Sequence, residues 1–118
     1  MKKIFIVLIL VIMILFSCAT TQTIGMYNWA DYDNVSYKFL KNRTQEETQN
    51  IINCYLKMIN DTIGTRNMPP PGVCADYGFL LIQLEKEKEG IRYLEMEKEY
   101  YPESSVFIDR IIKKYKET

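Results

Sequence analysis

The stretch that most constrains the fold runs from residue 71 to residue 102 and is predicted to form one helical hairpin. Its two helices are expected over 73–84 and 90–101, with the large residues Tyr77, Leu81 and Leu94 close to two glycines. Gly78 and Gly90 lie within these segments, and a residue without a side chain lets two helices approach closely. The stretch therefore predicts a pair of helices that cross at the two glycines.

The landmarks of this hairpin resemble those of the tetratricopeptide repeat, a helical repeat with a period of about 34 residues. With Gly78 aligned to the small residue of the first helix, the other landmarks follow without a gap, at Tyr77, Leu81, Gly90, Leu94 and Pro102. Two residues depart from the pattern. Glu85 stands where a turn glycine is usual, and Glu97 stands where a small apolar residue is usual.

Further helices are predicted on both sides of the hairpin. Thr44 and Glu47 form a capping box before an apolar stripe, which predicts a helix over 45–63. A short helix is expected over 35–41 and a last helix over 105–116. Together these segments predict an all-α fold, a short tetratricopeptide-like array of about four helices after an N-terminal signal peptide.

An array this short has open ends, because repeat proteins usually need about three units to bury a continuous core. We therefore expect one of two solutions. Either the aromatic residues of 27–39 cap the stack, or a partner protein completes it.

The N-terminus has the features of a bacterial lipoprotein signal. Lys2 and Lys3 precede an unbroken apolar run of 13 residues over 4–16, shorter than the roughly 20 residues that cross a bilayer. Ser17 and Cys18 then resemble the end of a lipobox, in which the cysteine is acylated and becomes the new N-terminus. An uncleaved anchor or an ordinary signal peptide is the alternative.

The chain is thus divided into a lipoprotein signal peptide over 1–17, a tether over 18–26 and a helical domain over 27–118. Lipidated Cys18 would hold the domain to a membrane, and two acyl chains make such an anchor stable. Ala19 follows the cysteine. The resemblance to sorted lipoproteins of enteric-type bacteria implies that a non-acidic residue there directs the protein to the outer membrane, with the domain facing the periplasm.

Composition excludes several classes of function. Removal of Lys2 and Lys3 with the signal leaves 13 basic side chains against 15 acidic ones, a net charge of about −2. Nucleic acid is therefore a poor partner. The chain contains no histidine, which excludes Ser/His and Cys/His nucleophiles and leaves a zinc site short of ligands. We therefore expect that the protein is not an enzyme and that it binds no metal ion, no other cofactor and no small-molecule substrate.

Cys54 and Cys74 are predicted to stay unbridged although the mature chain faces an oxidising compartment. Their distances from the ends of their helices differ by ~10 Å. This offset exceeds the ~7 Å limit for a disulfide. Cys74 is instead expected to fill a small position in the core.

Aromatic residues are the first candidates for partner binding. Tyr27, Trp29 and Tyr32 lie close together before the first helix of the domain, and Tyr77 belongs to the hairpin. The functional interpretation is an aromatic surface on which a partner docks. The alternative is that the rings cover the open face of the hairpin, because a small core needs large side chains.

Glu97 is the second candidate, because its carboxylate stands on the inner side of a predicted helix. An unpaired buried charge costs several kcal/mol, so we expect a partner among Lys98, Arg110 and the hydroxyls of Tyr93 and Tyr100. Two readings stay open: Glu97 anchors a partner protein, or the helix is rotated so that the side chain reaches water.

Residues 26–114 resemble a family of small bacterial lipoproteins of unknown function. The shared motifs are Tyr27-x-Trp29-x-x-Tyr32, Pro70-Pro71-Gly72, Glu95-Met96-Glu97-Lys98 and Pro102-Glu103-Ser104. Many members have glycine in place of Glu85 and alanine in place of Gly90, which implies a looser hairpin here. The family is often encoded beside a lipoprotein like the curli secretion channel, which implies an accessory role in outer-membrane assembly or export.

The sequence thus favours a membrane-anchored adaptor that contacts another envelope lipoprotein or channel. Two alternatives remain. One is a structural or surface lipoprotein without a dedicated partner, and the other is a peptide- or ligand-binding module with Trp29, Tyr32 and Glu97 along a groove.

Overall fold

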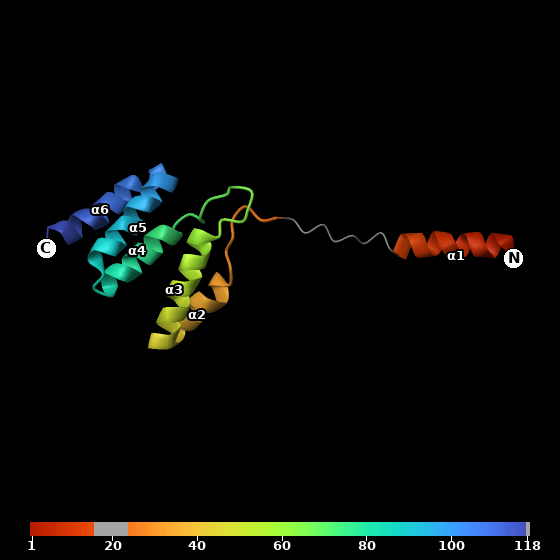
Figure 1. Cartoon of the computed structure of the whole chain (residues 1–118), viewed down its shortest axis with the longest axis horizontal. Coiled ribbons are helices and arrows are strands. Elements are labelled where there is room, and N and C mark those ends of the chain that lie inside the picture. Colours follow the sequence, from red (N-terminus) through yellow and green to blue (C-terminus); the bar gives the residue numbers. More distant parts are fainter. Residues whose placement is uncertain (16–23, 118) are drawn as a thin grey trace.

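Each apolar stripe of the sequence forms a helix, and Thr44 and Gly72 stand at the N-terminal ends of two of these helices. The computed structural model describes residues 1–15 and 24–117, which contain α-helices and no strand (Figure 1). The fold is all-α, as predicted. Its elements are α1 (Lys2–Leu15), α2 (Tyr32–Asn42), α3 (Gln45–Asn60), α4 (Val73–Gln83), α5 (Glu87–Tyr100), a 3₁₀ turn (Pro102–Ser104) and α6 (Ser105–Lys116).

Helix α1 covers most of the apolar run that follows the N-terminal lysines. Among the helices that the structure describes, none combines the length and the apolar character needed to cross a membrane. Cys18 lies outside the described residues, so its lipidation stays a prediction.

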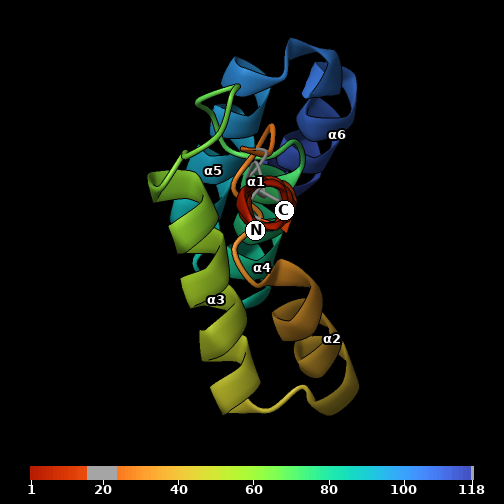
Figure 2. The ribbon, with the colours of Figure 1, turned by 90° about the vertical axis from the view of Figure 1, so that its right-hand side faces the viewer.

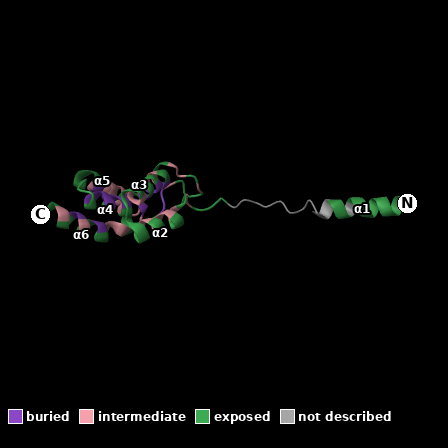
Figure 3. Ribbon diagram, turned by 90° about the horizontal axis from the view of Figure 1, so that it is seen from below, coloured by how far each residue is buried: buried purple, intermediate pink, exposed green. Residues whose placement is uncertain are grey.

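Two helical hairpins, α2–α3 and α4–α5, lie side by side, and α6 packs on the second (Figures 1 and 2). One core cluster joins α3 to α4 through Ile51, Cys54, Tyr55, Met58, Val73, Tyr77, Leu80 and Leu81. A second joins α4 and α5 to α6 through Ile82, Leu94, Ile108 and Ile112. The buried residues lie where these helices meet (Figure 3).

The two ends of the stack differ. At one end Tyr32, Val35 and Phe39 of α2 pack against the first cluster, which is the aromatic capping predicted for residues 27–39. At the other end α6 leaves Val106 and Phe107 largely exposed. Helix α6 therefore closes the second hairpin with one face and presents an uncovered apolar pair on another.

Helices α4 and α5 cross at Gly78 and Gly90, as predicted. A Cβ atom on Gly90 would lie 2.5 Å from the carbonyl oxygen of Gly78 and 2.6 Å from Cγ1 of Ile82. The backbones touch because neither glycine carries a side chain. The looser hairpin implied by the family resemblance is therefore wrong: Gly90 allows a closer crossing than alanine would.

Three helix boundaries differ from the prediction by three residues each. Helix α2 begins at Tyr32, whose N–H donates to the carbonyl of Trp29 at 3.1 Å. Helix α5 begins at Glu87, because Glu85 adopts a left-handed φ of 63° and completes the turn early. Helix α3 begins at the Thr44 cap as predicted, with the Glu47 N–H donating to Oγ1 at 3.2 Å, but ends at Asn60.

Helix α3 ends early because the following loop turns to pair with residues 25–28. The N–H groups of Thr65 and Arg66 donate to the carbonyls of Gly25 and Met26 at 3.2 and 3.1 Å. The Asn28 side chain donates to the Asp61 carbonyl at 2.8 Å. The last part of the predicted tether therefore lies against the folded domain.

Candidate functional site

The predicted aromatic residues belong to one row of rings that crosses the domain. Adjacent ring centroids lie 6.4, 6.2, 5.9, 5.8 and 4.6 Å apart along the series Tyr27, Trp29, Tyr32, Tyr55, Tyr77 and Tyr93. Each such contact contributes about 0.5–1.5 kcal/mol beyond simple burial. Four of the predicted binding residues are thus brought together, and the row ties the segment before α2 to α3, α4 and α5.

The row runs from the surface into the core. Trp29 is 47% exposed and Tyr32 is half-buried, whereas Tyr55 and Tyr77 are buried. Sequence reasoning did not single out Tyr55, although it stands in the apolar stripe of α3. The rings at the inner end serve the core, and those at the outer end remain available to a partner.

A polar group stands at the middle of the row, where Tyr32 and Tyr55 approach Asp76. Burial raises the pKa of Tyr32, and the Asp76 charge raises it further. Burial also raises the pKa of Tyr55, and here the neighbouring Tyr32 adds to the shift. The pKa of Asp76 is raised by loss of hydration, against a hydrogen bond with Tyr32 that lowers it. Asp76 is the one charged residue of α4, a signal that sequence reasoning overlooked.

These polar groups border an open groove between α2 and α4, with α3 at its base. Its volume is about 220 Å³. The lining side chains are Tyr32, Ser36, Phe39, Leu40, Ile51, Tyr55, Asp76, Phe79, Leu80 and Gln83. Leu40 and Phe79 flank it with exposed apolar surface, 63% and 40% exposed. The groove mixes apolar side chains with polar groups, namely the Asp76 carboxylate, the phenols of Tyr32 and Tyr55, the Ser36 hydroxyl and the Gln83 amide.

Glu97 is buried, with 3% of its surface exposed, and caps the start of α4. Its Oε1 accepts from the Gly72 N–H at 2.7 Å, and its Oε2 accepts from the Ala75 N–H at 3.4 Å. The first backbone N–H groups of a helix lack partners within the helix, and a carboxylate there also meets the positive end of the helix dipole. Of the two alternatives left open for Glu97, the one in which its side chain reaches water is therefore wrong.

The predicted side-chain partners of Glu97 are wrong as well. Lys98 pairs with Glu95 and Asp109 at 3.0 and 2.6 Å. Burial raises the pKa of Glu97, while the N–H groups of Gly72, Ala75 and Cys74 lower it. Hydrogen bonds from backbone N–H groups therefore stabilise the buried Glu97 carboxylate.

Three prolines and a glycine hold the start of α4 where Glu97 can reach it. Pro69 and Pro70 are buried, and the hydroxyl of Tyr101, just after α5, donates to the Pro69 carbonyl at 2.7 Å. Gly72 has a left-handed φ of 88°, which favours glycine because a Cβ atom is strained there. The segment before α4 is therefore held against the end of α5.

Cys54 and Cys74 are both free and buried, which confirms the predicted absence of a disulfide between them. Burial raises the pKa of Cys74 to about 12, and the Glu97 charge contributes to the rise. Burial also raises the pKa of Cys54. Neither thiol is activated for nucleophilic chemistry, because such activation requires a lowered pKa.

The site as a whole offers shape and apolar surface more than reactive groups. Within residues 1–15 and 24–117, no three side chains of the metal-binding types gather at one point. The groove can accept apolar side chains, and Asp76 can accept a hydrogen bond at its edge.

Comparison with known proteins gives a family and no relative of known function. Searches of curated proteins and of solved structures found no match. A family described as a domain of unknown function, DUF4810, matches residues 26–111, which include every helix after α1 up to most of α6. The chain therefore belongs to the DUF4810 family.

Proposed function

We propose that this chain is a membrane-anchored adaptor lipoprotein that binds another envelope protein through the groove between α2 and α4. The observation that carries the proposal is the groove. Two exposed apolar side chains, Leu40 and Phe79, flank a hollow that α2, α3 and α4 line together. Contiguous apolar surface of this kind marks contact sites in small soluble domains.

The size of the groove favours a protein ligand over a small molecule. Its volume of about 220 Å³ lies below the roughly 300–1,000 Å³ of typical small-molecule pockets. One or two apolar side chains projecting from a partner would fill it. A donor on the partner, such as a backbone N–H or a basic side chain, would give Asp76 a further hydrogen bond beside that with Tyr32.

The five predicted binding residues have different parts in this proposal. Tyr32 lines the groove and contacts the partner. Tyr77 and Glu97 are buried and act indirectly, because they hold α4 in the position that forms one wall. Tyr27 and Trp29 extend the aromatic row to the outer surface beside the groove.

Lipidation of Cys18 would tether the adaptor to the outer membrane with its domain in the periplasm. The signal-like residues 1–17 support this anchorage. Family resemblance supports an accessory role in outer-membrane assembly or export, with a lipoprotein or channel as the partner.

Photo-crosslinking in the native envelope tests the adaptor role. A photoreactive residue replaces Phe79 in the groove or, in parallel, Phe107 on the open face of α6. We expect one recurrent crosslinked protein from position 79, and we expect Leu40→Ser to remove it while the chain stays folded by circular dichroism.

The other outcomes separate the alternatives. A recurrent crosslink from position 107 alone would move the partner surface to the open end of the stack. Absence of a crosslink from either position would favour a structural lipoprotein without a dedicated partner.

A further inference from the structure

We infer that the domain makes a second contact with the membrane, through an exposed apolar patch that docks on the phospholipid surface. The patch consists of Ile24, Met26, Trp29 and Ile63. This inference rests on the proposed function in one respect, namely that the N-terminal end of the chain is anchored. It adds an orientation for the domain, which an acyl tether alone would not impose.

The four side chains of the patch are strongly exposed for their size. Ile24 is 71% exposed, Met26 54%, Trp29 47% and Ile63 68%. Ile24, Trp29 and Ile63 border one shallow hollow of about 450 Å³, together with Gly25, Tyr27, Asn28, Ala30, Lys57 and Asp61. Exposed apolar side chains that converge on one hollow indicate a contact surface.

The patch is built by tertiary contacts, since Ile63 is far from the other three residues in the sequence. The hydrogen bonds from Thr65 to Gly25 and from Arg66 to Met26 bind the two segments together. A Cβ atom on Gly64 would lie 2.6 Å from the Met26 carbonyl oxygen, so glycine is needed for this close approach. Ile24, Trp29 and Ile63 therefore form one surface, and Met26 lies in the segment that builds it.

The position of the patch in the chain identifies lipid as its occupant. Ile24 follows Cys18 by six residues, and six extended residues reach ~20 Å at most. An anchor at Cys18 therefore keeps the patch within that distance of the acyl chains. Retention of α1 as an uncleaved anchor would still keep it within about 30 Å.

The chemistry of the patch suits the border between lipid and water. Tryptophan is enriched at membrane interfaces because its ring is apolar and its N–H is polar. Lys57 borders the hollow and Arg66 lies in the adjoining loop, where both can approach lipid phosphates. Asp61 also borders the hollow, so the attraction is chiefly apolar.

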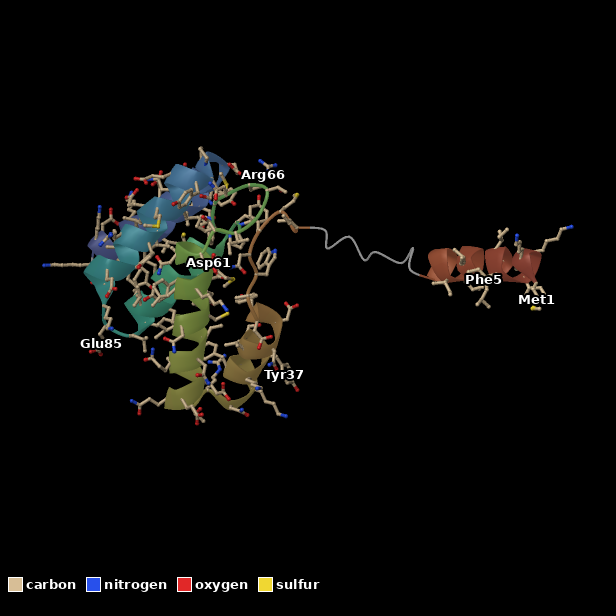
Figure 4. All side chains as sticks on the ribbon, turned by 45° about the vertical axis from the view of Figure 1, so that its right-hand side comes forward. Met1, Phe5, Tyr37, Asp61, Arg66 and Glu85 are labelled. Carbon is tan, nitrogen blue, oxygen red and sulfur yellow. The ribbon has the colours of Figure 1, made fainter. Side chains whose placement is uncertain are left out.

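Docking at this patch would orient the rest of the domain. Arg66 lies in the loop before α4 and Glu85 lies in the turn after it, so they stand at opposite ends of that helix (Figure 4). Tyr37, on α2, is also remote from Arg66 in this view. The turn at Glu85 and the far end of α2 would therefore point away from the membrane.

The single tryptophan provides a direct test, because Trp29 is the only one in the chain. The full chain, produced as the native lipoprotein, is reconstituted into vesicles of phosphatidylethanolamine and phosphatidylglycerol. Half of the preparations carry bromine on the acyl chains, which quenches an indole in contact with them. Vesicle flotation reports anchorage, and Trp29 emission reports docking.

We expect the floated protein to show blue-shifted Trp29 emission, quenching by brominated lipid and protection from aqueous iodide. The double variant Ile24→Ser/Ile63→Ser should float equally well but lose most of the quenching by lipid. The matched control Tyr37→Ser/Leu84→Ser removes exposed apolar side chains from α2 and from the end of α4, and it should keep the quenching by lipid. Circular dichroism verifies that both variants stay folded.

Two results would overturn the inference, and they are distinguishable. Protein that floats while Trp29 stays open to iodide and unaffected by brominated lipid is anchored without docking, which leaves the proposed function standing. Protein that does not float refutes the anchorage and the docking together.

Discussion

Replacement of Glu97 by alanine tests whether a buried carboxylate holds the start of α4 in place. The variant deprives the Gly72 and Ala75 N–H groups of their acceptor inside the protein. Hydrogen bonds to charged groups contribute ~1.5–3 kcal/mol each, and weaker ones less. Counting about 2 kcal/mol for the bond of Gly72 and about 1 kcal/mol for the longer one of Ala75, we expect a loss of about 3 kcal/mol in the free energy of unfolding.

Urea unfolding of the full chain in mild detergent, followed by far-ultraviolet circular dichroism, measures this loss. With a slope of about 1.5 kcal/mol per molar urea, the midpoint should fall by about 2 M. Glu99→Ala is the matched control, because Glu99 lies exposed on the same helix, and it should change stability by less than about 0.5 kcal/mol. A loss below about 1 kcal/mol for Glu97→Ala would refute the capping role.

The pH dependence of stability gives a second test of the same residue. Burial raises the pKa of Glu97 above its ordinary value of 4.5, so the folded state holds the proton more tightly than the unfolded state. Its contribution to stability is therefore fully present below pH 4.5 and is lost as the pH rises through the folded pKa. Glu97→Gln has no proton to lose and should lack this decline. Identical pH profiles for the wild type and this variant would contradict the assignment.

Three further predictions concern the hairpin and the buried thiols. Glu85→Gly should raise the free energy of unfolding by about 1 kcal/mol, because glycine adopts the left-handed φ of 63° without strain; unchanged or lower stability in a urea titration would argue against strain at this turn. Gly90→Ala should lower it by about 2 kcal/mol, because the new Cβ would press on the Gly78 carbonyl, and a stabilised variant would show that the helices can separate freely. Cys54 and Cys74 should resist a thiol reagent at pH 8 until urea unfolds the chain, because both are buried with raised pKa values; rapid labelling of the native chain would refute their burial.

The order and the type of the helices could be predicted from the sequence because the signals that form a helix are local. The Thr44 cap, the spacing of apolar residues and the glycines at 78 and 90 act within a few turns of backbone. The same locality explains the boundary errors, since the early end of α3 depends on a loop that pairs with a distant segment, around Gly25.

The amino-acid sequence by itself determined the all-α fold, the glycine crossing of α4 and α5, and the unbridged cysteines, because each follows from spacing along one or two helices. Only the tertiary structure decided what Glu97 does, since its partners are backbone N–H groups 22 and 25 residues away and every residue except proline carries such a group. It also decided that Tyr55 and Tyr77 join the row that begins at Tyr27. The spacing of residues along the chain does not predict such contacts, because they depend on how whole helices are placed against one another.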